Sequence, residues 1–185
     1  MNSKNTALIV IDIQKDFCTK GSAYNKLGYP IEHNFALAKK INKAIKQFRD
    51  KNIPIYFILS NYDDFVIKGD KCVFCLSGSK GTEPCLPEEK ADRIIIKKTH
   101  DGFYNTKLDF FLKKDKVKNI LIAGISTSVC VDSTARSGVA RGYNVVVLSN
   151  LVASRNKDFH KFALDNFKNN FGEVDNSKNL LKKIK

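Results

Sequence analysis

The stretch NILIAGISTSVCVDSTA, residues 119–135, joins an apolar run to a group of small and hydroxyl residues around a single cysteine. The run 119–123 is short and continuously apolar, which predicts a parallel strand buried on both faces. Small and apolar residues then recur at helical spacing, which predicts a helix over 129–141. Cys130 is thereby placed where a strand turns into a helix. At such a point unpaired N–H groups and the helix dipole favour a thiolate, so we expect Cys130 to be reactive.

The rest of the chain repeats this alternation of buried strands and amphipathic helices. It predicts an α/β fold with a doubly wound, mostly parallel sheet sandwiched between helices, a three-layer Rossmann-like arrangement. The predicted strands are residues 6–13, 53–59, 93–97, 119–123, 144–148 and 171–174. The predicted helices are residues 31–51, 107–114, 129–141, 157–170 and 177–183, with Thr106 capping the second of them.

Residues 61–92 show no clean periodicity and contain several glycines and prolines. They predict a long loop, and loops of that length in compact domains usually serve a site or a lid. No linker, repeat or low-complexity segment divides the chain, so we expect a single domain over residues 1–185.

The composition indicates the cellular compartment in which we expect the protein. Apolar residues make up 43% of the chain, and no stretch approaches the roughly 20 consecutive apolar residues that a membrane helix needs. The first residues lack the apolar core of a signal peptide. We therefore expect a cytoplasmic protein without a membrane partner. Its five cysteines, an odd number, are expected to be thiols, ligands or nucleophiles rather than disulfides.

The formal net charge of +13 raises the question of nucleic acid binding. The lysines are spread along the whole chain, and no basic cluster is interleaved with aromatic residues in a known binding motif. We interpret the charge as a solvated lysine-rich surface and expect no nucleic acid partner. Such a charge can still steer anionic small molecules toward a cleft.

Three reactive side chains fall at predicted carboxyl ends of strands, where open parallel sheets bind their ligands. Asp12 lies inside the apolar end of the first strand, Lys97 ends the third, and Cys130 follows the fourth. Alone, Asp12 is equally well explained as a buried acid that holds a loop, and Lys97 is better explained as a lysine snorkelling from a strand end. Together they supply a nucleophile, a base and an orienting cation, with Asp and Lys in place of the usual His.

None of the three histidines is a convincing base from its position. His33 and His160 fall on predicted helices. His100 lies in the loop after Lys97 and remains the one histidine that we expect near the site.

Three motifs in this order resemble those of the isochorismatase-like cysteine hydrolase superfamily, which includes nicotinamidases, N-carbamoylsarcosine amidases and ureidoacrylate amidohydrolases. Residues 8–17, LIVIDIQKDF, are similar to the opening motif that carries the catalytic Asp. Residues 96–108 are similar to the lysine motif, and residues 124–135 to the cysteine motif. The resemblance covers nearly the whole chain.

The resemblance implies a mechanism and a site. Cys130 would attack an amide, ureido or carbamoyl carbonyl, release ammonia or an amine, and form a thioester that water hydrolyses. It also implies a cis peptide between Ile125 and Ser126, and an oxyanion hole built from the backbone N–H groups of Ser126 and Cys130. We expect no cofactor for this chain, and the resemblance suggests a homo-oligomer acting on a small molecule.

Departures from the family pattern narrow the function. Nicotinamidases carry a metal site in a Thr-x-Asp-Trp-His-Pro segment, whereas residues 60–65 here read SNYDDF and contain no His. The missing His argues against a nicotinamidase-type metal centre and makes nicotinamide a less favoured substrate. True isochorismatases lack the nucleophilic cysteine, so Cys130 favours amide-type chemistry. Nicotinamidase activity and a catalytically idle scaffold remain the alternatives.

Other features have two explanations each. Cys72 and Cys75 have CxxC spacing and Cys85 follows; coincidence in a variable loop is the preferred interpretation, and a zinc clip or a redox pair the alternative. Substrate-pocket candidates flank the catalytic motifs, although core packing explains the aromatic ones equally well. These candidates are Phe17, Asn61 and Phe103.

Overall fold

Six parallel strands form one sheet in the computed structural model, which describes residues 1–185 except 64–65, 68–69 and 86–90. The spatial order is β5-β2-β1-β6-β7-β8, and every neighbouring pair is parallel. The strands are β1 (Thr6–Ile11), β2 (Ile55–Ser60), β5 (Arg93–Lys97), β6 (Asn119–Ile125), β7 (Asn144–Ala153) and β8 (Glu173–Asp175). The predicted doubly wound α/β fold is confirmed.

The strand order reverses between β1 and β6. From β1 the chain winds outward through β2 to β5, then returns to β6 on the other side of β1 and winds outward through β7 to β8. Ligands of open α/β sheets bind beyond the carboxyl ends of the strands at such a reversal. The fold therefore assigns a site to the ends of β1 and β6.

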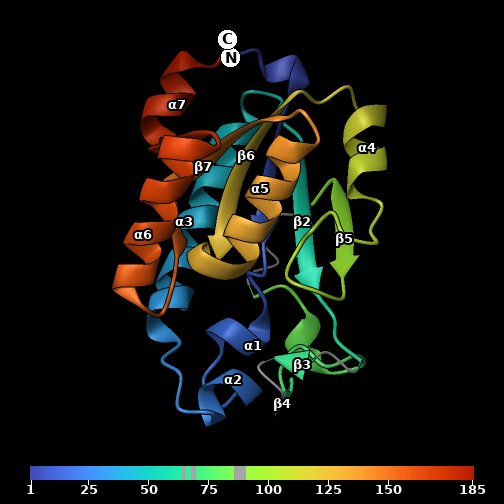
Figure 1. The fold of residues 1–185 in the computed structure, drawn as a ribbon, viewed down its shortest axis with the longest axis vertical. Helices are drawn as coiled ribbons and strands as arrows, with labels where there is room; N and C mark the ends of the chain where they lie inside the picture. The colour runs from blue at the N-terminus through green and yellow to red at the C-terminus, as the bar shows by residue number, and fades with distance from the viewer. Residues whose placement is uncertain (64–65, 68–69, 86–90) are drawn as a thin grey trace.

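Helices cover both faces of the sheet. The core on one face contains residues of α3 (Glu32–Arg49) and α7 (Ser177–Lys183), and the core on the other contains residues of α4 (Leu108–Lys114), α5 (Asp132–Ala140) and α6 (Lys157–Asn170). Figure 1 shows the two termini together at one end, and the strand arrowheads pointing to the other. No helix within the described ranges is long and apolar enough to cross a membrane.

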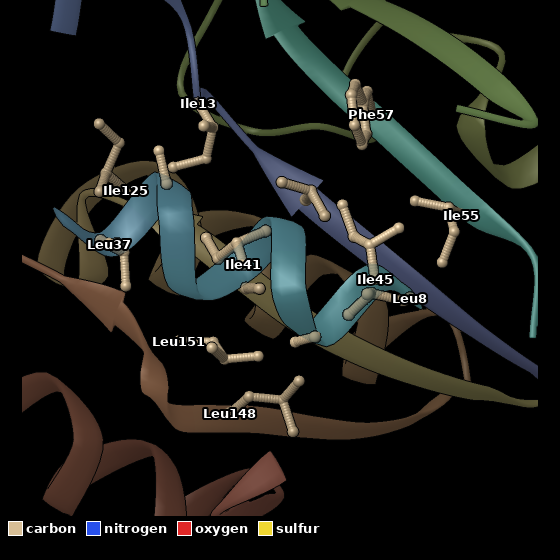
Figure 2. Close-up of a cluster of buried hydrophobic side chains, with 14 of the residues drawn as sticks. Leu8, Ile13, Leu37, Ile41, Ile45, Ile55, Phe57, Ile125, Leu148 and Leu151 are labelled. Carbon is tan, nitrogen blue, oxygen red and sulfur yellow. The ribbon is translucent and has the colours of Figure 1, made fainter. Parts of the chain in front are cut away.

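The long helix α3 is held by an apolar stripe that faces the sheet. Leu37, Ile41 and Ile45 recur every four residues, so they lie on one side of the helix, and each is at most 5% exposed. They meet Leu8 of β1 and Leu148 of β7 in the cluster drawn in Figure 2. Burying each such side chain contributes about 1.5–3 kcal/mol, which fixes α3 across the middle of the sheet.

The end of the molecule beyond the strand arrowheads is built from short elements (Figure 1). The predicted loop 61–92 is not featureless, although some of its residues lie outside the described part of the chain. It contains a small antiparallel hairpin, a 3-10 turn and isolated bridges that join Tyr62 to Leu76 and Pro84 to Gln14. The short elements here are α1 (Lys15–Cys18), α2 (Ala23–Lys26), β3 (Val66–Ile67), β4 (Asp70–Lys71) and η2 (Lys80–Thr82); η1 (Ser3–Asn5) lies near the N-terminus.

Several boundaries differ from the sequence prediction. The predicted first strand, 6–13, stops at Ile11 because Asp12 turns into the left-handed region with φ 54°. The predicted helix 129–141 begins instead as a π-helix over Thr127–Val131 and continues as α5. The last strand falls at Glu173–Asp175 rather than 171–174, because Phe171 ends α6.

Two further predictions need smaller adjustments. β7 extends to Ala153 instead of 148, since it resumes pairing with β6 after a register shift. Thr106 precedes the N-cap of α4, yet its hydroxyl accepts a hydrogen bond from the Leu108 N–H at 3.2 Å. It thus caps the helix from one position further out.

Candidate active site

Asp12 is aimed into the site by a bend at the end of β1. Asp tolerates the left-handed conformation better than most residues, and the bend takes its carboxylate out of the strand's alternation. The neighbouring strand approaches very closely here: a Cβ on Gly124 would lie 2.1 Å from the carbonyl oxygen of Ile11, and Gly124 has φ 126°. Only glycine fits at that point of β6.

The structure brings Asp12, Lys97 and Cys130 together. The Nζ of Lys97 lies 2.9 Å from Oδ2 of Asp12 and 3.5 Å from Sγ of Cys130. The Asp12 carboxylate also lies close enough to the Cys130 thiol to raise its pKa. All three residues are buried, with Lys97 at 0% and Cys130 at 7% exposure. A carboxylate, an ammonium and a thiol therefore share one small volume.

Ser60 completes the group from the end of β2, where it pairs in register with Lys97. Its hydroxyl accepts a 2.6 Å hydrogen bond from Lys97 and donates one of 2.9 Å to Oδ1 of Asp12. Its N–H donates to the same Asp12 oxygen and to the side-chain carbonyl of Gln14. The hydroxyl also bonds to that of Tyr62 at 2.8 Å. Ser60, Gln14 and Tyr62 were not predicted from the sequence.

The nucleophile candidate lies in a π-helical turn. Val131 N–H donates to Ser126 O at 3.2 Å, a five-residue step, and π-turns are frequent at functional sites. The peptide between Ile125 and Ser126 is cis. The Ser154 hydroxyl bonds to that of Ser126 at 2.8 Å and accepts from Ser128 N–H at 3.0 Å. These contacts hold the turn from the end of β7.

The resting site favours a thiol at Cys130, contrary to the sequence expectation of a thiolate. Burial and the Asp12 carboxylate raise the pKa of Cys130 to about 12, although Lys97 acts in the opposite direction. Burial alone would lower the pKa of Lys97, but the charges of Asp12 and Cys130 raise it above its ordinary value. Lys97 therefore keeps its ammonium form. Its positive charge compensates the Asp12 carboxylate and is not sufficient to hold Cys130 as a thiolate.

Of the histidines, His100 is the one that the structure places at Cys130. Its Nδ1 lies 3.6 Å from the sulfur. Burial and the Lys97 charge lower the pKa of His100, so the ring is neutral at pH 7. His160 instead bonds through Nδ1 to the Thr127 hydroxyl at 2.9 Å, at the start of the π-turn. His33 lies on α3.

The predicted pocket residues occupy different environments. Phe17 packs edge-on against Tyr24 and Phe74, and Phe103 stacks on Tyr143. Asn61 follows Ser60 directly, and its N–H donates to the Lys97 carbonyl at 3.1 Å. Its side-chain oxygen is buried and accepts no hydrogen bond from the described residues. Asn61 thus carries an unused buried acceptor at the position directly after Ser60.

Two further observations concern ligands. Within the described ranges, no group of three or more His, Cys, Asp or Glu side chains is arranged to hold a metal ion. A hollow of about 370 Å³ lies along the outer edge of β5, and its lining includes none of Asp12, Lys97 and Cys130. It is lined by Ile94, Ile95, Ile96, Asn105, Thr106, Lys107 and Phe111.

Comparison with known proteins agrees with the resemblance. The family model for the isochorismatase domain matches residues 6–178, so the chain belongs to the isochorismatase family. The chain is 26% identical over 199 residues to ureidoacrylate amidohydrolase RutB of Stutzerimonas stutzeri, covering 94% of this chain and 80% of that protein. It is 27% identical over 194 residues to the RutB of Yersinia enterocolitica, covering 91% and 84%.

Solved structures share the fold. A cysteine hydrolase from Pseudomonas syringae pv. phaseolicola superposes with a TM-score of 0.84 at 24% identity, covering 99% of this chain and 93% of that one. Nicotinamidase PncA from Bacillus subtilis superposes with a TM-score of 0.80, also at 24% identity, covering 92% and 99%. At this identity the similarity establishes the fold alone.

Proposed function

We propose that this protein is a cysteine-dependent amidohydrolase that cleaves a C–N bond of a small amide, ureido or carbamoyl compound. Cys130 is the nucleophile, Asp12 the general base and acid, and Lys97 the orienting cation. One observation carries the proposal: Lys97 lies within 2.9 Å of Asp12 and 3.5 Å of Cys130, in a buried site at the reversal of strand order. An ammonium buried between a carboxylate and a thiol suits nucleophilic catalysis.

In the first half-reaction, the Cys130 sulfur attacks the substrate carbonyl carbon while its proton passes to the Asp12 carboxylate. Coupling the transfer to attack suits a thiol whose pKa of about 12 keeps it protonated at rest. The tetrahedral intermediate collapses as Asp12 returns the proton to the leaving nitrogen. Ammonia or an amine departs, and a thioester remains on Cys130.

In the second half-reaction, Asp12 takes a proton from water as the water oxygen attacks the thioester carbonyl. The sulfur leaves and recovers the proton. The negative oxygen formed in both steps is held by the backbone N–H groups of Ser126 and Cys130, and one such donor is typically worth about 3 kcal/mol. Neutral His100, 3.6 Å from the sulfur, is a second group able to accept a proton there.

The substrate class follows from the relatives and from Asn61. The relatives named above are ureidoacrylate amidohydrolases, and a ureido group presents N–H donors beside its carbonyl. The unused Asn61 oxygen is an acceptor for such a donor. The net charge of +13 favours an anionic substrate in solution. We further propose a cytoplasmic homo-oligomer.

The test is an ammonia-release screen over ureidoacrylate, carbamoyl amino acids, simple amides and nicotinamide, with and without a chelator. We expect turnover of a ureido or carbamoyl compound that the chelator leaves unchanged, and a loss of about 10³-fold or more in Cys130→Ala. A hit that survives Cys130→Ala contradicts the mechanism. Chelator-sensitive turnover of nicotinamide alone would instead support the nicotinamidase alternative.

A further inference from the structure

Four cysteines outside the catalytic group gather on the α3 side of the sheet. Cys18, Cys72 and Cys75 are buried in that core, and Cys85 packs against it. The CxxC pair does not join thiol to thiol: the Cys72 thiol donates to the Phe74 carbonyl at 3.3 Å, and the Cys75 thiol to the Gly81 carbonyl at 3.9 Å. The CxxC spacing that is conspicuous in the sequence therefore does not correspond to a hydrogen bond between the two thiols.

Cys18 and Cys85 are neighbouring thiols, since each shifts the pKa of the other. Their backbones are already fixed side by side. Cys85 N–H donates to the Ile13 carbonyl at 2.9 Å, and Lys15 N–H donates to the Glu83 carbonyl at 2.8 Å. Gln14 and Pro84 form an antiparallel bridge between these bonds. Residues 13–18 and 83–85 are thus held together independently of the sulfurs.

The two thiols differ in the way that a reactive and a resolving thiol differ. Cys18 is 2% exposed, whereas Cys85 is half-buried. The hydrogen bond from Cys18 lowers the pKa of Cys85 despite its burial, and the Lys15 charge lowers it further. The bond to Cys85 and burial raise the pKa of Cys18. Cys85 is accordingly the thiol that a dissolved oxidant reaches first, and Cys18 is the buried thiol of the pair.

We propose that Cys18 and Cys85 form a reversible disulfide when the protein is exposed to a peroxide. The Cys85 thiolate attacks one peroxide oxygen and the O–O bond breaks. Hydroxide is the leaving group, and Cys85 becomes a sulfenic acid. The Cys18 sulfur then attacks the Cys85 sulfur, forming the S–S bond and releasing water with the Cys18 proton. Two thiols lose two electrons, and one hydrogen peroxide becomes two waters. A dithiol reverses the reaction by exchange.

The disulfide would clamp the segment beneath the catalytic carboxylate. Gln14 donates to the carbonyls of Thr82 and Ser60, and Ser60 bonds to Asp12. A covalent link between α1 and Cys85 closes a long loop of the chain, and such links stabilise by restricting the unfolded state. The oxidised protein should therefore resist unfolding more than the reduced one. This inference does not depend on the proposed amidohydrolase activity.

The experiment uses the full chain carrying Cys130→Ala, which removes the remaining thiol. The protein is treated with one equivalent of hydrogen peroxide, blocked with N-ethylmaleimide and digested with trypsin without reductant. Trypsin places Cys18 in residues 16–20, Cys85 in 81–90, and the other two cysteines together in 72–80. We expect the peptides 16–20 and 81–90 to be linked, lighter by two hydrogens, and separated by dithiothreitol.

Variants sharpen the result. Cys85→Ser should abolish the link and the shift of the urea midpoint on oxidation, while the matched change Cys72→Ser should retain both. Cys18→Ala, which leaves a small apolar side chain in the core, should leave Cys85 as a sulfenic or sulfinic acid. A bond within 72–80, a link between 72–80 and 81–90, or stable sulfinic acid on Cys85 of the parent protein would overturn the proposal.

Discussion

The Nζ of Lys97 lies 2.9 Å from Oδ2 of Asp12, and the two side chains expose only 0% and 2% of their surface. Removing either charge leaves the other buried without its partner, whereas removing both leaves no uncompensated charge. Breaking a buried pair by deleting one member typically costs about 3–5 kcal/mol. The pair therefore makes a prediction about stability that is separate from catalysis.

We expect Asp12→Asn and Lys97→Met each to lower the free energy of unfolding by about 3–5 kcal/mol, and the double variant to lose less than the sum. Urea unfolding of the four proteins measures the coupling. Asp63→Asn is a matched control, because Asp63 pairs with Lys98 at 2.7 Å in a half-exposed bridge. Because both side chains are solvated, that change should leave the free energy of unfolding nearly unchanged. Additive losses at Asp12 and Lys97 would contradict the coupling.

Asp12→Asn should also separate two properties of Cys130 that usually change together. The Asp12 carboxylate raises the pKa of Cys130 and Lys97 lowers it, so the amide variant keeps only the second charge. We expect hydrolysis to fall by about 10²–10⁴-fold, the usual contribution of a general base. At the same time, alkylation of Cys130 by iodoacetamide at pH 8 should become faster.

The readout is the rate of Cys130 alkylation against pH, followed by mass spectrometry. In the parent protein the rate should climb steadily toward pH 12, and in Asp12→Asn it should level off at a lower pH. Lys97→Met is the matched opposite, because it removes the charge that lowers the pKa, and it should slow alkylation. A purely structural role for Asp12 would slow hydrolysis without shifting the alkylation profile.

Asn61 provides a prediction on substrate recognition. Its buried side-chain oxygen accepts no hydrogen bond from the described residues, so Asn61→Leu should leave the free energy of unfolding unchanged or slightly higher. Loss of an acceptor for the substrate N–H should lower kcat/KM by about 10–100-fold, mainly through KM. Steady-state kinetics on the substrate found by the ammonia screen measures this.

Asn119→Leu is the control for that change. The Asn119 amide donates to the side chain of Asn5 at 2.7 Å, at the opposite end of the sheet. Its loss should cost about 1–3 kcal/mol of stability without altering kcat/KM. If Asn61→Leu behaves like Asn119→Leu, Asn61 is a structural residue and not a substrate contact.

The triad could be predicted from the sequence because each member follows a recognisable apolar run. Ser60 could not, since a serine at the end of an apolar strand carries no charge or motif that sets it apart. Its position follows only from the register that places it opposite Lys97. Once β1 and β2 are taken as parallel neighbours, their ends lie at one edge of the sheet, and Ser60 becomes a candidate.

The expectation of a Cys130 thiolate was wrong for an electrostatic reason. Strand-to-helix geometry is visible in the sequence, but the pKa depends on how deeply the sulfur is buried and on which charge lies nearer. Both burial and Asp12 favour the thiol here. The π-turn was missed as well, because apolar spacing over five residues does not distinguish a π-turn from the first turn of an α-helix.

Two partly buried histidines make the folded protein sensitive to acid. Burial and Lys97 lower the pKa of His100, and burial and His33 lower that of His160, below the ordinary value of 6.5. Below about pH 6.5 the unfolded chain therefore binds more protons on these two rings than the folded chain does. The free energy of unfolding falls as the pH drops. Above that pH both states carry neutral rings, and these residues contribute no pH dependence.

We expect urea midpoints measured from pH 8 to pH 5 to be level at first and then to decline below about pH 6.5. His100→Gln and His160→Gln should each make that decline shallower, because glutamine keeps a polar side chain that does not titrate. His33→Gln should remove the repulsion felt by His160 and also soften the decline slightly. A decline of unchanged steepness in the double variant His100→Gln/His160→Gln would assign the acid sensitivity to carboxylates instead.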